Sequence, residues 1–333
     1  MKNLILLFVL TNCSVSFAQL FFDQKDTLRF TTDSSYARAI IRFNNELVFG
    51  TSKTGVISYN ERTKKTTTLI QKNSAGEFRD LAVKDGDLYA MVSGDDGIVL
   101  NYSRKTTQLL FQKNGLFLDD ILLSKNKLYL LGDPINGHFF ITEIAVNNQR
   151  KVSNIQLSNE PEEACYAASG TTACSVNKNY CFVSGGLTSA RFHQVNWQTK
   201  ESFSTNLPMT KGLGAGPFSL YFQTPLNGVI VGGNYLAPSS KTGTACYTND
   251  GGKTWNTSET NGYRSCVTGN EELLFACGTN GIDYSSDNGK SWHSFDTGNF
   301  CALLLEDNKL YATTNKGYCI VYQLKTFQLI DQN

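Results

Sequence analysis

A strand–turn–strand module that recurs about every 40 residues is the feature that most constrains the fold of this chain. In five copies, an opening residue lies nine positions before the first leucine of the second strand, and these opening residues are Arg38, Arg79, Asp119, Arg264 and Cys301. Two further copies begin at Cys165 and Pro217. Seven units of about 40 to 50 residues match the length of four-stranded propeller blades. The sequence therefore predicts an all-β fold, a seven-bladed β-propeller with four antiparallel strands per blade.

The later strands of each unit also follow from short apolar runs between polar turns. Third strands are expected at segments such as 55–59 and 281–285, and fourth strands at segments such as 66–71 and, in the last unit, 327–330. Residues 20–31 belong to no unit. Whether they add a strand that joins the first blade to the last is left open by the sequence.

Two turns share one pattern, ACYTNDGGKTW at 245–255 and GIDYSSDNGKSW at 281–292. Aspartate caps such a turn with its carboxylate, glycine supplies positive φ, and tryptophan buries a large ring between sheets. The residues in these roles are Asp250, Gly252 and Trp255 in the first turn, and Asp287, Gly289 and Trp292 in the second. This pattern is typical of the Asp-box, or bacterial neuraminidase (BNR) repeat, which predicts a hairpin at the blade periphery and carries no catalytic meaning.

Composition and the N-terminus set the expected location. The net charge of +1 gives no basis for binding nucleic acid. Residues 1–18 combine Lys2, an apolar run and a small-x-small site, which is typical of a signal peptide. We therefore expect an exported, monomeric protein with a single domain over 19–333, and no segment reaches the length of a membrane span. Cys13 lies in a weak lipoprotein box, so a lipid anchor is the alternative.

The cysteines allow two cross-strand pairs. Eight of the nine lie from Cys165 onward, and export would permit their oxidation. Cys174 and Cys181 flank one tight turn, and Cys266 and Cys277 flank another, so each pair is a candidate disulfide, with buried thiols as the alternative. The sequence contains no Cys-x-x-Cys motif and its three histidines are scattered, so we expect no metal and no cofactor.

The opening strands are expected to line the channel of the propeller. Their register directs Arg38, Arg79, Asp119 and Arg264 toward one end, together with Ser169 or Thr171 and with Ser219, and Asp80 and Asp133 lie nearby in the sequence. Guanidinium groups match the two oxygens of a carboxylate or phosphate. This arrangement predicts a site for an anionic ligand or an acidic peptide. The alternative is an internal ring of ion pairs, with Arg79 and Arg264 against Asp80 and Asp119.

Several motifs in order indicate a family. They are GEFRD (76–80), GDPINGHF (132–139), YAASGT (166–171), SGGLTSARF (184–192), GPFSLYF (216–222), VGGNY (231–235) and GYRS (262–265). The chain resembles the secreted bacterial relatives of the photosystem II stability/assembly factors. That resemblance implies a propeller that binds partners through an arginine-rich face and is not an enzyme. Some relatives carry the label "oxidoreductase", but the GxGxG at 212–216 lies in a loop without the strand and helix of a dinucleotide site.

The sequence thus favours a non-catalytic scaffold or recognition module. Its rival is a sialidase-like glycoside hydrolase, or a carbohydrate-binding propeller. In that case Arg38, Arg79 and Arg264 would bind the substrate carboxylate, Tyr263 would be the nucleophile and Glu77 its base. Adjacent residues of a strand point to opposite faces, so Tyr263 and Arg264 cannot both face the channel without a bulge.

Overall fold

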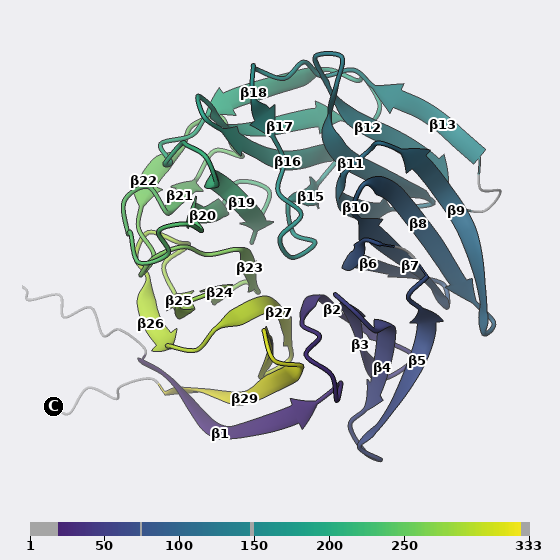
Figure 1. The fold of residues 1–333 in the computed structure, drawn as a ribbon. Helices are drawn as coiled ribbons and strands as arrows, with labels where there is room; N and C mark the ends of the chain where they lie inside the picture. Colours follow the sequence, from purple (N-terminus) through teal and green to yellow (C-terminus); the bar gives the residue numbers. More distant parts are fainter. Residues whose placement is uncertain (1–18, 74, 147–149, 328–333) are drawn as a thin grey trace, which may run out of the picture.

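The computed structural model describes residues 19–73, 75–146 and 150–327. Within these ranges the chain forms 29 strands and no helix, and the strands make seven antiparallel sheets arranged in a ring (Figure 1). The predicted seven-bladed β-propeller is therefore confirmed. In the described part of the chain no helix has the length and apolar character needed to cross a membrane. The predicted signal peptide and Cys13 lie outside the described residues.

Blades 1 to 3 are each built from four consecutive strands. Blade 1 contains β2 (Ala37–Phe43), β3 (Glu46–Thr51), β4 (Gly55–Asn60) and β5 (Lys65–Gln71). Blade 2 contains β6 (Glu77–Lys84), β7 (Asp87–Ser93), β8 (Asp96–Ser103) and β9 (Thr106–Asn114). Blade 3 contains β10 (Leu118–Ser124), β11 (Lys127–Ile135), β12 (His138–Ala145) and β13 (Arg150–Ile155).

Blade 4 differs because its innermost position is divided between two short strands that both pair with the next strand. It contains β14 (Glu163–Ala164), β15 (Ala173–Val176), β16 (Asn179–Gly186), β17 (Ala190–Asn196) and β18 (Ser202–Asn206). Blade 5 contains β19 (Ala215–Phe222), β20 (Gly228–Asn234), β21 (Ala245–Thr248) and β22 (Asn256–Ser258). Blade 6 contains β23 (Cys266–Gly269), β24 (Leu274–Gly278), β25 (Gly281–Ser285) and β26 (His293–Asp296).

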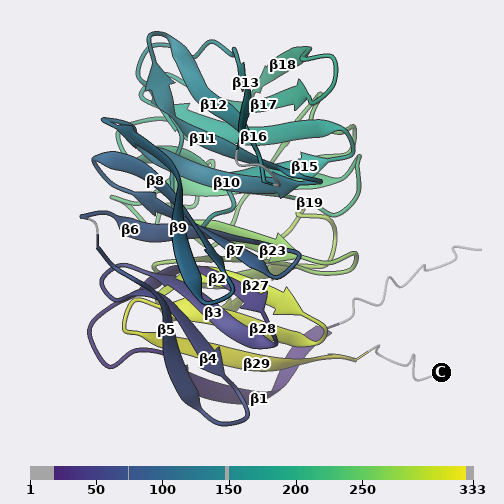
Figure 2. The ribbon, with the colours of Figure 1, turned by 90° about the vertical axis from the view of Figure 1, so that its right-hand side faces the viewer.

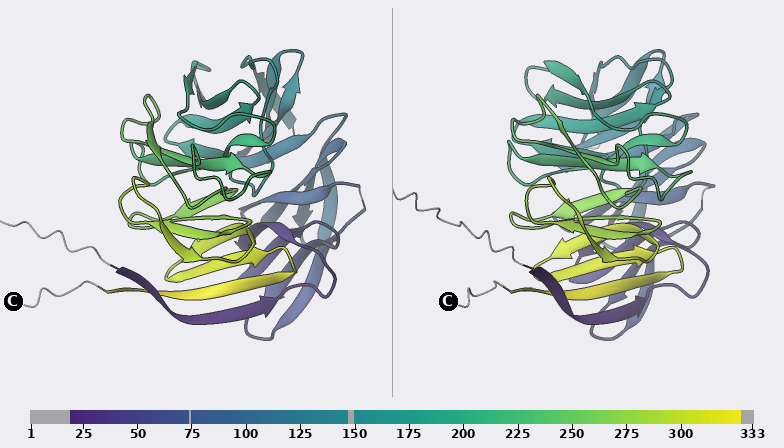
Figure 3. Two further views of the ribbon diagram at one scale, coloured as in Figure 1. Left: turned by 60° about the vertical axis from the view of Figure 1, so that its left-hand side comes forward. Right: turned by 90° about the vertical axis from the view of Figure 1, so that its left-hand side faces the viewer.

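Blade 7 closes the ring with a strand from the other end of the chain. It contains β27 (Phe300–Glu306), β28 (Lys309–Thr314) and β29 (Tyr318–Phe327), and its outer strand is β1 (Gln19–Arg29). The pairing of β1 with β29 runs from Gln19 opposite Phe327 to Arg29 opposite Tyr318, along the edge seen in Figure 3. The segment whose role the sequence left open is thus a latch. The expected fourth strand at 327–330 is wrong at Phe327, which ends β29, and residues 328–330 lie outside the described residues.

The core lies between the blades. Each of the seven blade-to-blade interfaces has its own cluster of buried apolar side chains. Seen from the side, the sheets stack face to face around the ring (Figure 2). The innermost strands of neighbouring blades contact one another around the whole circle, including β27 with β2. Closed stacking of this kind leaves only short sheet edges exposed.

Candidate functional site

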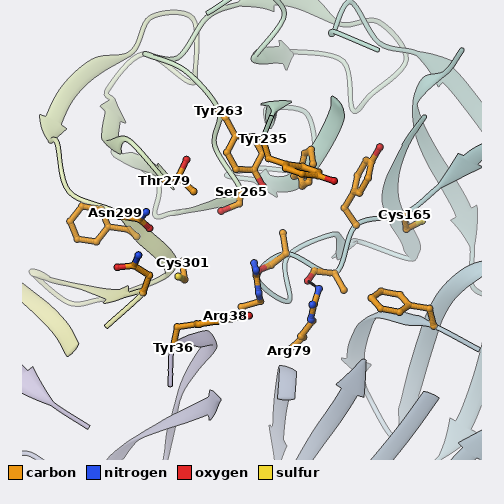
Figure 4. A pocket seen from close by; sticks show the side chains of 17 residues that line it. Tyr36, Arg38, Arg79, Cys165, Tyr235, Tyr263, Ser265, Thr279, Asn299 and Cys301 are labelled. Carbon is orange, nitrogen blue, oxygen red and sulfur yellow. Dashed lines mark hydrogen bonds between the residues drawn. The ribbon is translucent and has the colours of Figure 1, made fainter. Parts of the chain in front are cut away.

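A cavity of about 590 Å³ occupies one end of the channel. Its walls come from inner strands and from the loop that joins β14 to β15. Blades 1 to 3 contribute Tyr36, Arg38, Arg79 and Phe117, and blades 5 to 7 contribute Phe218, Tyr235, Tyr263, Ser265 and Cys301. In Figure 4 the side chains of Arg38 and Arg79 lie across the opening from Tyr235 and Tyr263. The cavity therefore has a cationic side and an aromatic side.

β-Bulges explain which side chains reach the cavity. Five inner strands carry one extra residue against their partner strand, and these extra residues are Arg38, Arg79, Asp119, Phe218 and Cys301. A bulge turns the strand locally and redirects the side chain at that position. All of these residues except Asp119 line the cavity. Arg38 and Arg79, which hold the same position in their repeats, therefore both reach the cavity.

Arg38 and Arg79 share one carboxylate. Glu77 Oε2 lies 3.0 Å from Arg79 Nη2 and 3.7 Å from Arg38 Nε. Glu77 Oε1 accepts a hydrogen bond of 2.5 Å from the Tyr36 hydroxyl. Arg38 Nε is buried and has no hydrogen-bond partner among the described residues. Burial and the nearby charge of Arg38 lower the pKa of Arg79. Two guanidinium groups and one carboxylate leave one positive charge in excess on this side of the cavity.

A plug loop, residues 165–172, forms the floor of the cavity. It runs from β14 to β15 and reaches into the central opening (Figure 1). Arg79 Nη1 donates to the Ala167 carbonyl at 3.0 Å, and Arg38 Nη1 donates to the Ala168 carbonyl at 3.3 Å. Gly170 has φ of +64°, and a Cβ there would lie 2.2 Å from Asp80 Oδ1. The loop is therefore fitted closely against blades 1 and 2, and the two arginines both hold it and face the cavity.

The predicted hydroxyl residues anchor this loop below the cavity and are not among its lining residues. Ser169 Oγ donates to the Ser265 carbonyl at 2.8 Å. The Thr171 and Ser219 hydroxyls lie 2.6 Å apart, and Ser219 Oγ accepts from the backbone N–H of Val267 at 2.9 Å. Ser169 and Ser219 are buried. Their role in this structure is to connect the plug to blades 5 and 6.

The predicted aspartates are buried behind the inner strands. Asp80 accepts backbone hydrogen bonds from Leu81 and Ile121, and Asp120 accepts from Thr172 and Ala173 of the plug region. Burial, followed by the nearby Asp120 carboxyl, raises the pKa of Asp80 well above its ordinary value. Burial likewise raises the pKa of Asp120 to about 7. These carboxyls therefore secure backbone and do not line the cavity.

Asp119 and Asp133 form a second pair of acids near the plug. Asp119 is fully buried, and burial followed by the Asp133 and Asp120 carboxyls raises its pKa well above the ordinary range. Burial raises the pKa of Asp133 to about 6. Asp119, which the register directed to the channel mouth, is not among the residues that line the cavity. Its expected position at the mouth is wrong, because the carboxyl is fully buried even though Asp119 is a bulged residue like Arg38 and Arg79.

Arg264, which the sequence places at the channel mouth, differs most from its expected position. Its side chain is 1% exposed, with Nε and Nη2 at 2.9 and 2.8 Å from Asp283 Oδ2. Arg264 Nη1 donates to Asn280 Oδ1 at 2.6 Å and to the Tyr263 carbonyl. Tyr263 and Ser265, which directly precede β23, line the cavity, whereas Arg264 between them is not among the lining residues. The alternative ring is also wrong in its partners, since Arg79 pairs with Glu77 and Arg264 with Asp283.

The aromatic wall is the part that sequence reasoning missed. Tyr166 of the plug stacks on Phe218 with ring centroids 4.2 Å apart, and Phe218 meets Tyr263 edge-on at 4.9 Å. Tyr235 lies 6.4 Å from both Phe218 and Tyr263. These aromatics occur within the motifs YAASGT, GPFSLYF, VGGNY and GYRS. The motifs place these residues near the ends of inner and second strands, but nothing in them shows that the rings meet in one wall.

One buried cluster in blade 4 has the residue types of a catalytic triad. Ser184 Oγ lies 2.6 Å from His193 Nε2, and Glu163 accepts from Ser184 and Arg191. In a triad the carboxylate binds Nδ1 of histidine, whereas here Nδ1 faces Ser204 Oγ at 2.7 Å. Ser184 and His193 are fully buried. The cluster therefore has the wrong order and no access for a substrate, and it serves to fix β14 against β16 and β17.

The remaining predicted residues lie outside the cavity. Cys174 faces Cys181 and Cys266 faces Cys277 in register, and all eight cysteines in the described ranges are free thiols. In the two Asp-Gly turns, Asp250 accepts from Thr254 and Asp287 accepts from Ser291. Both turns connect third to fourth strands at the outside of the ring. Gly252 and Gly289 have φ of +88° and +78°, and the Trp255 and Trp292 rings pack between blades.

Comparisons with known proteins show a similarity of fold alone. No protein-family model and no curated protein matches the sequence. Virginiamycin B lyase from Staphylococcus aureus is similar in structure, with a TM-score of 0.63, 10% identity, and coverage of 92% of this chain and 99% of that chain. BamB from Moraxella catarrhalis is similar with a TM-score of 0.56 and 13% identity, over 86% and 85% of the two chains.

A chain of a mitotic checkpoint complex is also similar, with a TM-score of 0.61 and 11% identity, over 97% of this chain and 99% of that chain. These identities are too low to transfer a role, since one fold hosts many functions. The likeness to photosystem II assembly factors and the Asp-box assignment stay predictions.

Proposed function

We propose that this protein is a non-catalytic recognition module that binds a partner protein through an anionic group held at the arginine-bearing mouth of its channel. The observation that carries the proposal is the sharing of one carboxylate, Glu77, by Arg38 and Arg79 at the wall of a 590 Å³ cavity. Arg38 Nε is buried and has no hydrogen-bond partner among the described residues, so it is a donor that an incoming oxygen would satisfy.

Three further points support a binding role. The plug contributes Cys165, Tyr166, Ala167 and Ala168 to the cavity wall, so a bound group would contact it as well as the arginines. The sequence resemblance implies partner binding through arginines, and one similar propeller belongs to a multiprotein complex. The proposal includes export, because residues 1–18 have the composition of a signal peptide.

The sialidase-like alternative has less support. Only two of its three arginines line the cavity, and Glu77 bonds to Tyr36 instead of Tyr263. Among the described residues that line the cavity there is no Asp or Glu to act as acid and base.

A photo-crosslinking experiment tests the proposal. A crosslinking amino acid at Tyr235, at the cavity rim, should capture a partner from the native exported fraction. The double change Arg38→Gln and Arg79→Gln should abolish that capture while the thermal midpoint shifts by only a few degrees. Arg62→Gln with Arg104→Gln is the matched control, because it removes two exposed arginines from outer hairpins. Equal capture by the Arg38/Arg79 variant would contradict the proposal.

A further inference from the structure

An apolar strip leads outward from the cavity over blades 4 and 5. It comprises Leu187, Leu213, Tyr235 and Leu236, and all four side chains are exposed. Leu213 is 74% exposed and Leu236 is 62% exposed, which is unusual for leucines on neighbouring loops. Exposed apolar patches of this kind mark interaction surfaces.

Backbone hydrogen bonds join the three loops that carry the strip, 186–189, 207–214 and 235–243. Gly212 N–H donates to the Gly186 carbonyl at 3.0 Å, and Tyr235 N–H donates to the Gly214 carbonyl at 3.1 Å. Thr210 N–H donates to the Gly243 carbonyl at 3.0 Å. The strip is therefore one surface supported by backbone, not a set of independent loop tips.

Tyr235 connects this surface to the cavity. It lines the cavity, and its ring packs against Gly214, where a Cβ would lie 2.8 Å from the ring. The exposed leucines at 213 and 236 flank these two residues in the sequence. An extended ligand that enters the cavity at Arg38 and Arg79 would thus continue along the strip.

The charges along the strip are of one sign. The three loops contain no Asp or Glu, and their only charged residues are the exposed Lys211 and Lys241. Lys241 Nζ bonds to a neutral partner, Asn261 Oδ1, so its charge is not cancelled. A ligand would place its acidic group inward, near the arginines and lysines.

We propose that the occupant is an extended peptide segment of a partner protein, in which an acidic side chain enters the cavity and two or three apolar residues next to it cover Leu213 and Leu236. This inference rests on the proposed function and adds the chemistry of the partner. A membrane surface fits less well, because the guanidinium groups are recessed in a cavity while the leucines lie outside it. The charge and apolar pattern together favour one chain over a flat bilayer.

The test starts from a random 12-residue peptide library displayed on phage and selected on the intact protein. We expect enrichment of peptides with an Asp or Glu beside Leu, Ile or Phe. Failure to enrich such peptides would overturn the proposal. An enriched peptide is then synthesised with a fluorophore and its dissociation constant is measured by anisotropy, along with its Asp→Asn or Glu→Gln counterpart.

Three variants separate the two proposals. Leu213→Ser with Leu236→Ser should weaken the peptide at least tenfold, and so should Arg38→Gln with Arg79→Gln. Leu109→Ser with Leu226→Ser is the matched control, because these leucines are 56% and 59% exposed on β9 and on the β19–β20 turn, and it should change the affinity less than twofold. Loss with the arginine variant alone would overturn the strip and leave the proposed function standing. Loss of affinity with the leucine variant alone would overturn the proposed function and leave the strip standing.

Vesicles of phosphatidylcholine with and without phosphatidylglycerol complete the experiment. The wild-type protein should not sediment with either. Sedimentation that Leu213→Ser with Leu236→Ser abolishes would replace the peptide by a membrane surface and overturn the proposal.

Discussion

Arg79 and Arg264 hold the same place in their repeats, nine residues before a leucine, yet they lie in opposite surroundings. At the inner edge of blade 2, Arg79 is a bulged residue that faces the cavity beside Glu77. At the inner edge of blade 6, Arg264 is buried against Asp283. The difference shows that place in a repeat does not determine where a side chain points.

The first hairpins of the two blades differ in register. In blade 2 the first hairpin closes with Lys84 opposite Asp87, which leaves a two-residue turn. In blade 6 it closes with Gly269 opposite Leu274, which leaves a four-residue turn. The inner strand of blade 2 also carries the bulge at Arg79, whereas the described pairing of β23 has no bulge. The same spacing in sequence thus corresponds to two different registers.

Stability should separate the two arginines most strongly. Arg264→Leu leaves the fully buried Asp283 without its ion-pair partner, so we expect a loss of about 3–5 kcal/mol in the free energy of unfolding. Arg79→Leu removes a partly exposed pair and should cost about 1 kcal/mol. Urea denaturation measures both. The double change Arg264→Leu with Asp283→Leu should recover most of the loss, and equal losses for the two single variants would refute the distinction.

The pH dependence of stability should depend on the buried aspartates of the inner strands of blades 2 and 3. The folded pKa of Asp120 is about 7, above the ordinary value of 3.8. The folded state therefore holds the proton more tightly, and this contribution to stability is lost as pH rises from about 4 to 7. Asp120 faces Asp80, whose pKa is also raised. Asp120→Asn should flatten the decline by an amount on the order of 1–3 kcal/mol.

Asp250 in the outer turn provides the contrasting case. Burial works against ionisation there, but hydrogen bonds from Thr254 and Thr248 lower the pKa of Asp250 to about 2. Its contribution is present above about pH 4 and is lost as pH falls toward 2. Unfolding midpoints measured from pH 2 to 8 should separate the loss of stability between pH 4 and 7, due to Asp120, from the loss between pH 4 and 2, due to Asp250. A decline between pH 4 and 7 that persists in Asp120→Asn would show that another group is responsible.

The smallest expected effect concerns catalysis. A fluorogenic sialoside should show no turnover above background, because Arg264 is absent from the cavity wall and Glu77 is engaged by Tyr36. Tyr36→Phe and Tyr263→Phe should leave that background unchanged. Turnover that either change abolishes would favour the hydrolase and would give Tyr36 and Tyr263 a common catalytic role.

The sequence predicted the ring well because blade formation depends on local features. Alternating apolar residues and polar turns define the strands, and buried residues such as Leu47, Leu88 and Leu310 occur at the predicted repeat positions. The side chains at the mouth depend on register and on long-range packing. Arg38 and Arg79 reach the cavity as expected, whereas Asp119 and Arg264 do not.

The plug and the aromatic wall were beyond reach for a different reason. Residues 165–172 form neither helix nor strand. Their position follows from hydrogen bonds to Arg38, Arg79 and Ser265, which lie far away in the sequence. Tyr166 and Tyr263 become neighbours of Phe218 only after the ring closes. No local pattern encodes that proximity.

The latch formed by β1 has a mechanical consequence. Gln19 and Phe327 lie opposite each other at the open end of the β1–β29 pair. A force that pulls these two residues apart would load the hydrogen bonds one after another, as in a zipper, because antiparallel bonds run perpendicular to the strands. The ring is therefore expected to open at this seam under tension well before any other blade unravels.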